Sequence, residues 1–338
     1  MKIVFFGTSE FAIPSLRLLI ARGMAPIAAI TAPDKPKGRG QRLKSSPIKQ
    51  WLVTSDQCVG KAEKIQVFQP EKLDSDFVLR ISNLKPDVGI VAAYGKILPK
   101  ELIDLFPNGV LNIHPSLLPK YRGPSPIQAT ILNGDKEAGV TIIQIDEKMD
   151  HGPIVAQQQL EPSVPLTEKG VVHRGQGGEI TSFFLKKTAY QELHDILAEL
   201  GAQLLIETLP KWVAGEITLI PQNDAKTTYT KLLKKEDGNI DWSKSAEEIE
   251  RMVRAYNPWP GSYMQVASDQ LLVASLKIKK AEVIIHPSSS PLHPGMFFKT
   301  ADGFPAITCG NGALKLLVVQ PEGKKEMSGD AFTHGYVK

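Results

Sequence analysis

The sequence predicts an α/β fold in which a Rossmann-like parallel sheet is followed by a small β-barrel of the OB-like kind. Short apolar runs alternate with segments of helical spacing over residues 2–145. Beyond residue 228 many short β-like runs are instead separated by Gly, Pro, Ser and Asp. The 338 residues also exceed what one hydrophobic core usually fills, so we expect two domains.

The first domain is predicted from five apolar runs with helices between them. The runs cover residues 2–6, 27–31, 87–94, 110–113 and 140–145. Helical spacing is present at residues 10–22, where Gly23 is a stop signal, and at residues 127–132. Short, continuously apolar strands separated by helices indicate a parallel sheet that is covered on both faces. In such sheets ligands bind beyond the carboxyl ends of the strands.

A long helix is predicted to complete this first domain, which we assign to residues 1–215. Its apolar residues recur at helical spacing over residues 188–213, before Gly215. Residues 216–228, which include Pro221, are predicted to be a linker.

The second domain is assigned to residues 229–338. Ser245 and Glu248 form a capping-box pattern at the start of a helix with Ile249, Val253 and Tyr256 facing inward, together with Met252. The β-like runs that indicate a barrel cover residues 263–267, 271–278, 281–285, 306–308 and 314–319.

The composition is that of a folded protein without membrane segments. No apolar run approaches the ~20 residues that span a bilayer. The chain start reads as a strand and turn, without a cleavable signal pattern. Cys58 and Cys309 lie in different predicted domains. We expect both thiols to be reduced, as in a cytoplasmic protein.

The positive charge is concentrated in one segment. The net charge of +4 is too small to identify a nucleic-acid partner, but residues 34–49 carry six basic residues and one acid, a local balance of +5. The basic residues are Lys35, Lys37, Arg39, Arg42, Lys44 and Lys49. The rest of the chain is therefore nearly balanced. On composition this segment is either a solvated charged loop or a flexible arm that neutralises phosphates.

Two classes of cofactor site are not predicted. The turn at residues 7–10 lacks both glycine-rich phosphate-binding patterns, so we expect neither a dinucleotide nor ATP. The spacing of the remaining histidines does not suit metal ligation, and we expect no metal. These histidines are His173, His194, His286, His293 and His334. His151 adjoins Asp150 but would face elsewhere in an extended segment.

Asn112, His114 and Asp150 are the candidate chemical groups. Asn112 and His114 lie where an apolar run ends, two residues apart, and so face the same way on a strand. They suit acyl transfer to an amine: the amide can donate to an oxyanion, and the imidazole can donate or exchange a proton. Asp150 could fix the imidazole tautomer and relay protons. The alternative is a structural Asn, a core His and a turn Asp, and sequence alone does not show that Asp150 meets His114.

The motif from Asn112 to Gly123 (NIHPSLLPKYRG), with MDHGP from Met149, resembles the folate-dependent formyltransferases. The resemblance implies that Asn112, His114 and Asp150 are catalytic and that 10-formyltetrahydrofolate is the formyl donor, without a metal. It also implies a folate site lined by Ser116, Leu117, Leu118 and Pro119, with Tyr94 and Gly95 as a further wall or simply a strand end and turn. Arg122 would shape the same loop or form a structural salt bridge.

The basic segment resembles a loop in the members of this family that formylate methionyl initiator tRNA. The pattern D-x-P-x-G-R-G begins at Asp34, and the resemblance implies tRNA binding by Arg39, Arg42 and Lys44. In the second domain five lysines are candidates for tRNA contact or plain surface residues. They are Lys277, Lys279, Lys280, Lys324 and Lys325.

The resemblance covers nearly the whole chain and implies formyl transfer to methionyl initiator tRNA. A monomer is the default expectation, and the cysteines favour the cytoplasm. The same chemistry on a sugar-nucleotide or ribonucleotide amine is the alternative, and a non-catalytic RNA-binding protein is a more distant one. The main departure is at residues 165–185, where extra residues replace an expected brief turn.

Overall fold

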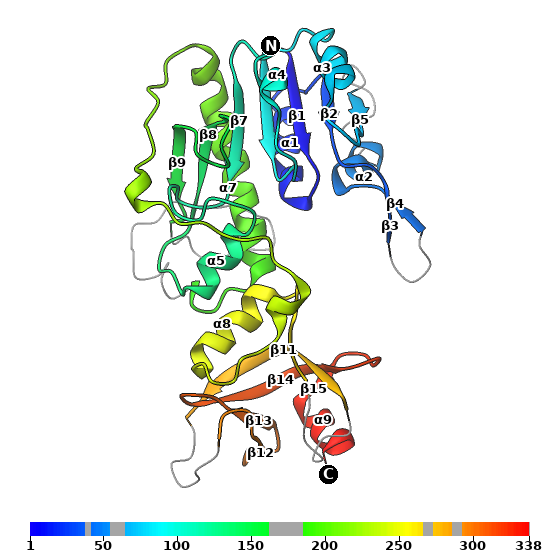
Figure 1. Ribbon diagram of the computed structural model, residues 1–338, viewed down its shortest axis with the longest axis vertical. Helices are drawn as coiled ribbons and strands as arrows, with labels where there is room; N and C mark the ends of the chain where they lie inside the picture. The colour runs from blue at the N-terminus through cyan, green and yellow to red at the C-terminus, as the bar shows by residue number, and fades with distance from the viewer. Residues whose placement is uncertain (38–41, 55–64, 162–184, 266–272, 286–292, 338) are drawn as a thin grey trace. The chain divides into compact units, whose positions relative to one another are not determined.

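The computed structural model describes residues 1–37, 42–54, 65–161, 185–265, 273–285 and 293–337 (Figure 1). Several predictions fall outside the described residues: those on Arg39, Cys58, His173 and His286, and on nearly all of the departure at residues 165–185. No helix within the described ranges is long and apolar enough to cross a membrane.

The chain forms two compact units, each of which is built from three separate segments of the sequence. The first comprises Met1–Pro126, Glu137–Gly177 and His194–Lys231. The second comprises Ile127–Lys136, Gly178–Leu193 and Leu232–Lys338. Each unit has a sheet and a hydrophobic core of its own.

The first unit contains a seven-stranded sheet with β1 near its middle (Figure 1). In sheet order its strands are β5 (Gln66–Phe68), β2 (Ala28–Ile30), β1 (Ile3–Gly7), β6 (Val88–Ala92), β7 (Val110–His114), β8 (Gly139–Gln144) and β9 (Ile154–Gln159). The five strands from β5 to β7 pair in parallel, which confirms the Rossmann-like prediction. β8 and β9 extend the sheet in antiparallel fashion. Residues 145–153, which join β8 to β9, are fewer than the dozen or so that a parallel crossover needs.

Helices cover both faces of this sheet, as the continuously apolar strands predict. The helices of this unit are η1 (Glu10–Ala12), α1 (Ile13–Ala21), α2 (Pro47–Thr54), α3 (Ser75–Ser82), α4 (Lys100–Ile103), η3 (Asp224–Lys226) and α7 (Tyr190–Val213), of which α7 belongs to the unit from His194 on. On one face Phe6 packs in a cluster with Phe77 of α3 and Leu102 of α4. On the other face Gly201 of α7 lies so close to Ile113 that an added Cβ would come within 2.7 Å of the Ile113 side chain.

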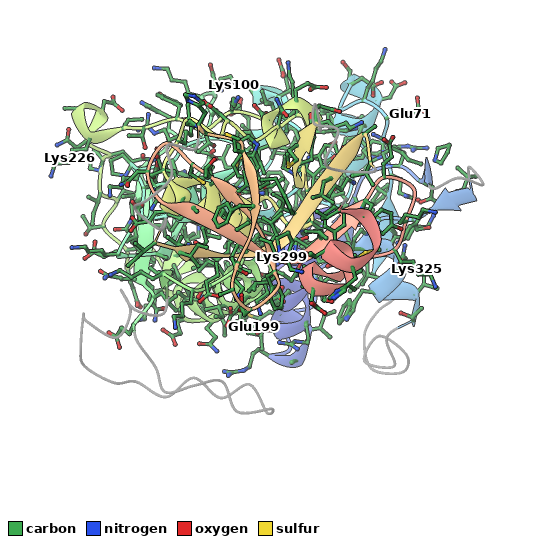
Figure 2. All side chains as sticks on the ribbon, turned by 90° about the horizontal axis from the view of Figure 1, so that it is seen from below. Glu71, Lys100, Glu199, Lys226, Lys299 and Lys325 are labelled. Atoms are coloured by element: carbon green, nitrogen blue, oxygen red, sulfur yellow. The ribbon has the colours of Figure 1, made fainter. Side chains whose placement is uncertain are left out.

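The long helix predicted at residues 188–213 is confirmed with a start two residues later. Arg17 of α1 forms an ion pair of 2.7 Å with Glu199 of α7, which Figure 2 labels. The indole of Trp212 donates to the carbonyl oxygen of Asn108 at 2.7 Å. These contacts join α7 to α1 and to the segment that precedes β7.

The second unit is built on a six-stranded antiparallel sheet, which confirms the prediction of short strands in a small barrel-like domain (Figure 1). Its strands are β10 (Ser262–Gln265), β11 (Ser275–Ile284), β12 (Phe297–Lys299), β13 (Pro305–Thr308), β14 (Ala313–Pro321) and β15 (Met327–Ser328). Its helices are α5 (Pro126–Leu132, from Ile127 on), η4 (Lys235–Gly238), α8 (Ala246–Tyr256) and α9 (Gly329–Tyr336). Apolar residues of α8 and α9 pack in one cluster with residues of β11 and β14.

The predicted capping box begins α8. The Ser245 hydroxyl accepts from the Glu248 backbone N–H at 3.3 Å, and the Glu248 carboxylate accepts from the Ser245 N–H at 3.0 Å. Ile249 and Val253 are buried in the cluster, as the helical spacing predicts.

Candidate active site

The end of β7 places Asn112 and His114 on one face of the sheet. Asn112 is opposite Val91 of β6 and Ile143 of β8, and His114 is opposite Thr141 of β8. The backbone of Asn112 is therefore paired with strands on both sides, and that of His114 with β8. His114 is buried, with 4% of its surface exposed.

Asp150 meets both of these residues, although it lies in the connection between β8 and β9. Its Oδ1 accepts from Asn112 Nδ2 at 3.2 Å, and its Oδ2 lies 3.7 Å from His114 Nδ1. Oδ2 also accepts from the backbone N–H of Gly123 at 2.8 Å. The structure therefore brings together the three residues that the sequence singled out.

The tautomer of His114 is set by a backbone carbonyl and not by Asp150. His114 Nε2 lies 2.9 Å from the carbonyl oxygen of Tyr121, which can only accept, so Nε2 carries the hydrogen. His114 Nδ1 therefore holds the lone pair of the neutral ring, and it faces Asp150. At 3.7 Å the Nδ1–Oδ2 pair is longer than a hydrogen bond but within reach of an ion pair once the ring is protonated.

Residues 116–119 form a wall beside His114 that is held mainly through its backbone. The Thr141 hydroxyl donates to the carbonyl oxygen of Ser116 at 2.6 Å and accepts from the Leu118 N–H at 3.1 Å. Gln157 of β9 donates to the carbonyl oxygen of Leu118 at 2.9 Å. The side chains of Ser116 and Leu118 are buried, whereas Leu117 and Pro119 are half-buried.

Tyr94 is buried, whereas its neighbour Gly95 is exposed to solvent. The Tyr94 ring has 4% of its surface exposed and packs edge-on against Phe6, with centroids 5.6 Å apart. Its hydroxyl is buried without a hydrogen-bond partner among the described residues, and burial raises the pKa of Tyr94 to about 12. Gly95 is exposed, in the left-handed region at φ +83°. The Tyr94 side chain thus belongs to the core of the sheet.

Arg122 forms the salt bridge that was one of its two predicted roles. Only 1% of its surface is exposed, and its Nη2 lies 2.9 Å from Asp224 Oδ1. Nε and Nη2 donate to Gln222 Oε1 at 3.0 and 2.9 Å. Gln222 in turn donates to the carbonyl oxygens of Asp150 and Gly152 at 2.9 and 2.7 Å.

Gln222 is the site residue that sequence reasoning missed. It lies in the segment predicted as a linker, which carries no apolar periodicity and no motif. In the structure this segment is bound to the first unit: Ile220 exchanges backbone hydrogen bonds with Ile154, and the Arg122 N–H donates to the carbonyl oxygen of Thr228 at 2.9 Å. No local sequence signal distinguishes a flexible linker from a segment that is hydrogen-bonded to the surface of a domain.

His151 faces away from the candidate site, although the segment is a turn at Asp150 and not extended. Its Nδ1 lies 2.6 Å from Asp146 Oδ2, and its Nε2 lies 3.9 Å from Asp224 Oδ2. Within the described residues no group of three or more His, Cys, Asp or Glu side chains is arranged to hold a metal ion. Cys309 is a buried free thiol, and burial raises its pKa to about 11.

The basic segment is a hairpin where the sequence suggested an irregular loop. β3 (Lys35–Lys37) pairs in antiparallel register with β4 (Arg42–Lys44). Backbone pairing in a hairpin does not require an apolar face, so apolar periodicity gave no signal of it. Lys44 is exposed at the end of β4, and Arg39 lies outside the described residues.

Lys49 is neutralised at the base of this hairpin. Its Nζ lies 2.8 Å from Asp34 Oδ2 and donates to Gln69 Oε1 at 2.6 Å. Hydrogen bonds from Gln69 and then from Lys49 lower the pKa of the Asp34 carboxyl. The positive excess of the segment therefore belongs to the five basic residues of residues 35–44.

The candidate lysines of the second unit fall into two groups. Lys279 lies at a bulge of β11, where its Nζ donates to Asn257 Oδ1 at 3.0 Å and lies 3.2 Å from Glu326 Oε1. The other four are exposed: Lys277, Lys280, Lys324 and Lys325, the last of which is labelled in Figure 2.

Comparison with known families and relatives covers nearly the whole chain. Residues 1–183 match the family model described as formyl transferase, and residues 232–337 match the formyl transferase C-terminal domain. A methionyl-tRNA formyltransferase of Chloroflexus aggregans is 40% identical over 99% of this chain and 97% of its own length. A relative of the same name from a Roseiflexus species is 43% identical over 97% of this chain and 90% of its own length.

Solved structures of low identity share the fold. An N-formyltransferase of Helicobacter canadensis, solved with folinic acid and dTDP-3-aminofucose, has a TM-score of 0.60 at 17% identity and covers 94% of this chain and 98% of its own. HypX of Aquifex aeolicus, solved with tetrahydrofolic acid, has a TM-score of 0.57 at 16% identity and covers 99% of this chain and 47% of its own.

Proposed function

Because the chain belongs to the formyl transferase family, and within it to the methionyl-tRNA formyltransferases, we propose that it transfers the formyl group of 10-formyltetrahydrofolate to the amino group of methionyl initiator tRNA. The product is N-formylmethionyl-tRNA for translation initiation. The observation that carries the chemistry is the convergence of Asn112, His114 and Asp150 at the end of β7. Full-length relatives of about 40% identity support the acceptor.

The reaction forms one C–N bond and breaks another. The amine nitrogen attacks the formyl carbon, and the bond from that carbon to N10 of the folate then breaks. The amine loses a proton and N10 gains one, so protons balance without an external acid. The residues must therefore stabilise negative charge on the formyl oxygen and carry protons between the two nitrogens.

Asn112 is our candidate for stabilising that charge. One N–H of its amide is used by Asp150 Oδ1, and no described residue accepts from the other. A neutral donor fixed by a carboxylate is preorganised for an oxygen that becomes negative in the transition state.

His114 and Asp150 are our candidates for proton transfer. The Tyr121 carbonyl holds Nε2–H, so a proton is taken up at Nδ1. Asp150 lies beside that atom, and its charge stabilises the imidazolium that forms. A covalent nucleophile has no part in the step.

The folate is proposed to lie against residues 116–119. The half-buried side chains of Leu117 and Pro119 offer apolar surface, while Ser116 and Leu118 support the loop from within. Gly95 and the backbone around Tyr94 are proposed as a further wall, because the Tyr94 ring itself lies in the core.

The tRNA is proposed to bind the basic hairpin and the second domain. Arg39, Arg42 and Lys44 belong to a segment, residues 35–44, that carries positive charge without a compensating acid, which suits a phosphate backbone. The exposed lysines of the second domain are proposed as further phosphate contacts. We propose that residues 1–215 are the catalytic domain, residues 216–228 a connecting segment and residues 229–338 the tRNA-binding domain. We also propose that the protein is a cytoplasmic monomer.

The test is formyl transfer from 10-formyltetrahydrofolate to methionyl initiator tRNA, with methionyl elongator tRNA in parallel. Fast product with the initiator alone supports both the chemistry and the acceptor. No product with either tRNA, but folate turnover with a sugar-nucleotide amine, would retain the chemistry and overturn the acceptor. No formyl transfer to any amine at saturating folate would leave the RNA-binding alternative.

A further inference from the structure

Asp150 holds its position at a backbone conformation that few residues adopt. Its φ is +48°, in the left-handed region, which costs an aspartate less than most side chains but more than glycine. The turn around it is tight, since a Cβ added at Gly152 would come within 1.8 Å of the Gln144 carbonyl oxygen. Such a conformation persists only where surrounding contacts determine it.

Gln222 supplies two of those contacts. Its Nε2 donates to the carbonyl oxygens of Asp150 and Gly152, at 2.9 and 2.7 Å, and so bridges the two sides of the turn. These bonds hold the backbone of Asp150. The carboxylate is held separately, by the Gly123 N–H and by Asn112.

Arg122 determines which way the Gln222 amide points. Its Nε and Nη2 both donate to Gln222 Oε1, and a guanidinium has no acceptor to offer. The amide oxygen must therefore face Arg122 and the amide nitrogen must face the two carbonyls. Arg122 is itself buried, paired with Asp224, and adjacent in sequence to Gly123.

We propose that Gln222 is a positioning residue for formyl transfer: oriented by Arg122, it clamps the turn that presents the Asp150 carboxylate to Asn112 and His114. The inference rests on the proposed function, because it assigns Gln222 to the reaction of that same site. Gln222 touches no reacting atom, and its effect passes entirely through Asp150. The segment that connects the catalytic and C-terminal domains therefore completes the catalytic geometry.

The variant that isolates this role is Gln222→Glu. A carboxylate of the same shape still accepts from Arg122, so packing and the buried charge remain compensated. It cannot donate to the carbonyls of Asp150 and Gly152, and its second oxygen repels them, so the clamp is lost while the pairing with Arg122 remains. Gln222→Ala removes both functions, and Gln203→Ala, at an exposed position of α7, is the matched control.

We expect kcat with initiator tRNA to fall on the order of 10²-fold in both Gln222 variants, as for a small misplacement of a catalytic group. The KM values for folate and tRNA should stay near those of the wild type, and Gln203→Ala should match the wild type in full. A purely structural role predicts instead that Gln222→Glu keeps wild-type kcat, because its pairing with Arg122 is retained. That result would overturn the proposal.

A crystal structure of Gln222→Glu tests the clamp without any activity. The expected result is that Asp150 leaves the left-handed region and its carboxylate moves away from Asn112. An unchanged turn would overturn the positioning role even if the wild type formylates tRNA. A wild type without formyl transfer would overturn the proposed function, while a displaced Asp150 would still support the clamp.

Discussion

Nδ1 of His114 and Oδ2 of Asp150 lie 3.7 Å apart, although a loop, α5 and β8 separate the two residues in the sequence. β8 ends beside Leu111 of β7, and the connection from β8 to β9 brings Asp150 back to Asn112 and His114. The carbonyl of Tyr121 holds the opposite side of the ring. The imidazole is thereby fixed between an acceptor at Nε2 and a carboxylate near Nδ1.

Replacing Asn112 by Ala removes the proposed donor to the formyl oxygen. We expect kcat to fall roughly 10²-fold or more, as loss of an oxyanion donor does, with little change in KM. Steady-state kinetics with methionyl initiator tRNA measures this, and Asn83→Ala, at the exposed end of α3, is the control. An unchanged kcat would assign Asn112 a structural role.

Replacing Arg39 by Ala should act on tRNA use and leave the chemistry intact. The expected result is a higher KM for tRNA and a weaker dependence of binding on salt, because one phosphate contact fewer releases fewer counterions. Binding measured across a salt series tests this, with Arg22→Ala at the exposed end of α1 as a variant of equal charge. If Arg39→Ala and Asn112→Ala gave the same pattern on a truncated acceptor, the separation of binding from chemistry would be wrong.

Tyr94→Phe should leave the KM for folate unchanged and keep or raise stability. The buried hydroxyl has no partner among the described residues, and leaving a buried polar group unsatisfied costs about 1–3 kcal/mol. Urea unfolding at pH 7 measures the difference. A higher KM for folate would show instead that the hydroxyl contacts the ligand.

The same variant should change how stability depends on alkaline pH. The pKa of Tyr94 is about 12 in the folded protein against an ordinary 10.0, so the unfolded chain loses this proton first. The contribution that this proton makes to the free energy of unfolding is therefore fully present below pH 10, and it is lost as the pH rises from 10 toward 12. The urea midpoint of unfolding is measured at about pH 9 and about pH 10.5, below and within this window. The difference between the two midpoints should be smaller in Tyr94→Phe than in the wild type.

Ser245→Ala should destabilise the second unit by about 1 kcal/mol, as loss of a helix N-cap does. The Ser245 hydroxyl accepts from the Glu248 N–H, and an alanine leaves that donor without this partner. Unfolding monitored in the full chain by a probe on α8 measures the effect. The control is Ser75→Ala, at an exposed position in the first turn of α3, where Asp74 provides the cap. Equal stability of the two variants would mean that water caps α8 as well as Ser245 does.

The sequence by itself determined the elements whose signal is local. The apolar runs at residues 2–6 and 110–113 became β1 and β7, because strands buried on both faces must be apolar throughout. The capping box at Ser245 began α8, because its two hydrogen bonds join residues only three positions apart. Motif resemblance likewise singled out Asn112, His114 and Asp150, which the structure brings together.

The tertiary structure alone decided the relationships between distant segments. The approach of Asp150 to His114 depends on the path of the connection from β8 to β9, and the hydrogen bonds from Arg122 to Gln222 join residues 100 positions apart. Tyr94 is a second example. The sequence suggested that it lines the folate site, but its ring packs into the core, whereas the neighbouring Gly95 is exposed. Local sequence specifies backbone propensity and side-chain chemistry, but long-range hydrogen bonds form only after packing has brought their partners together.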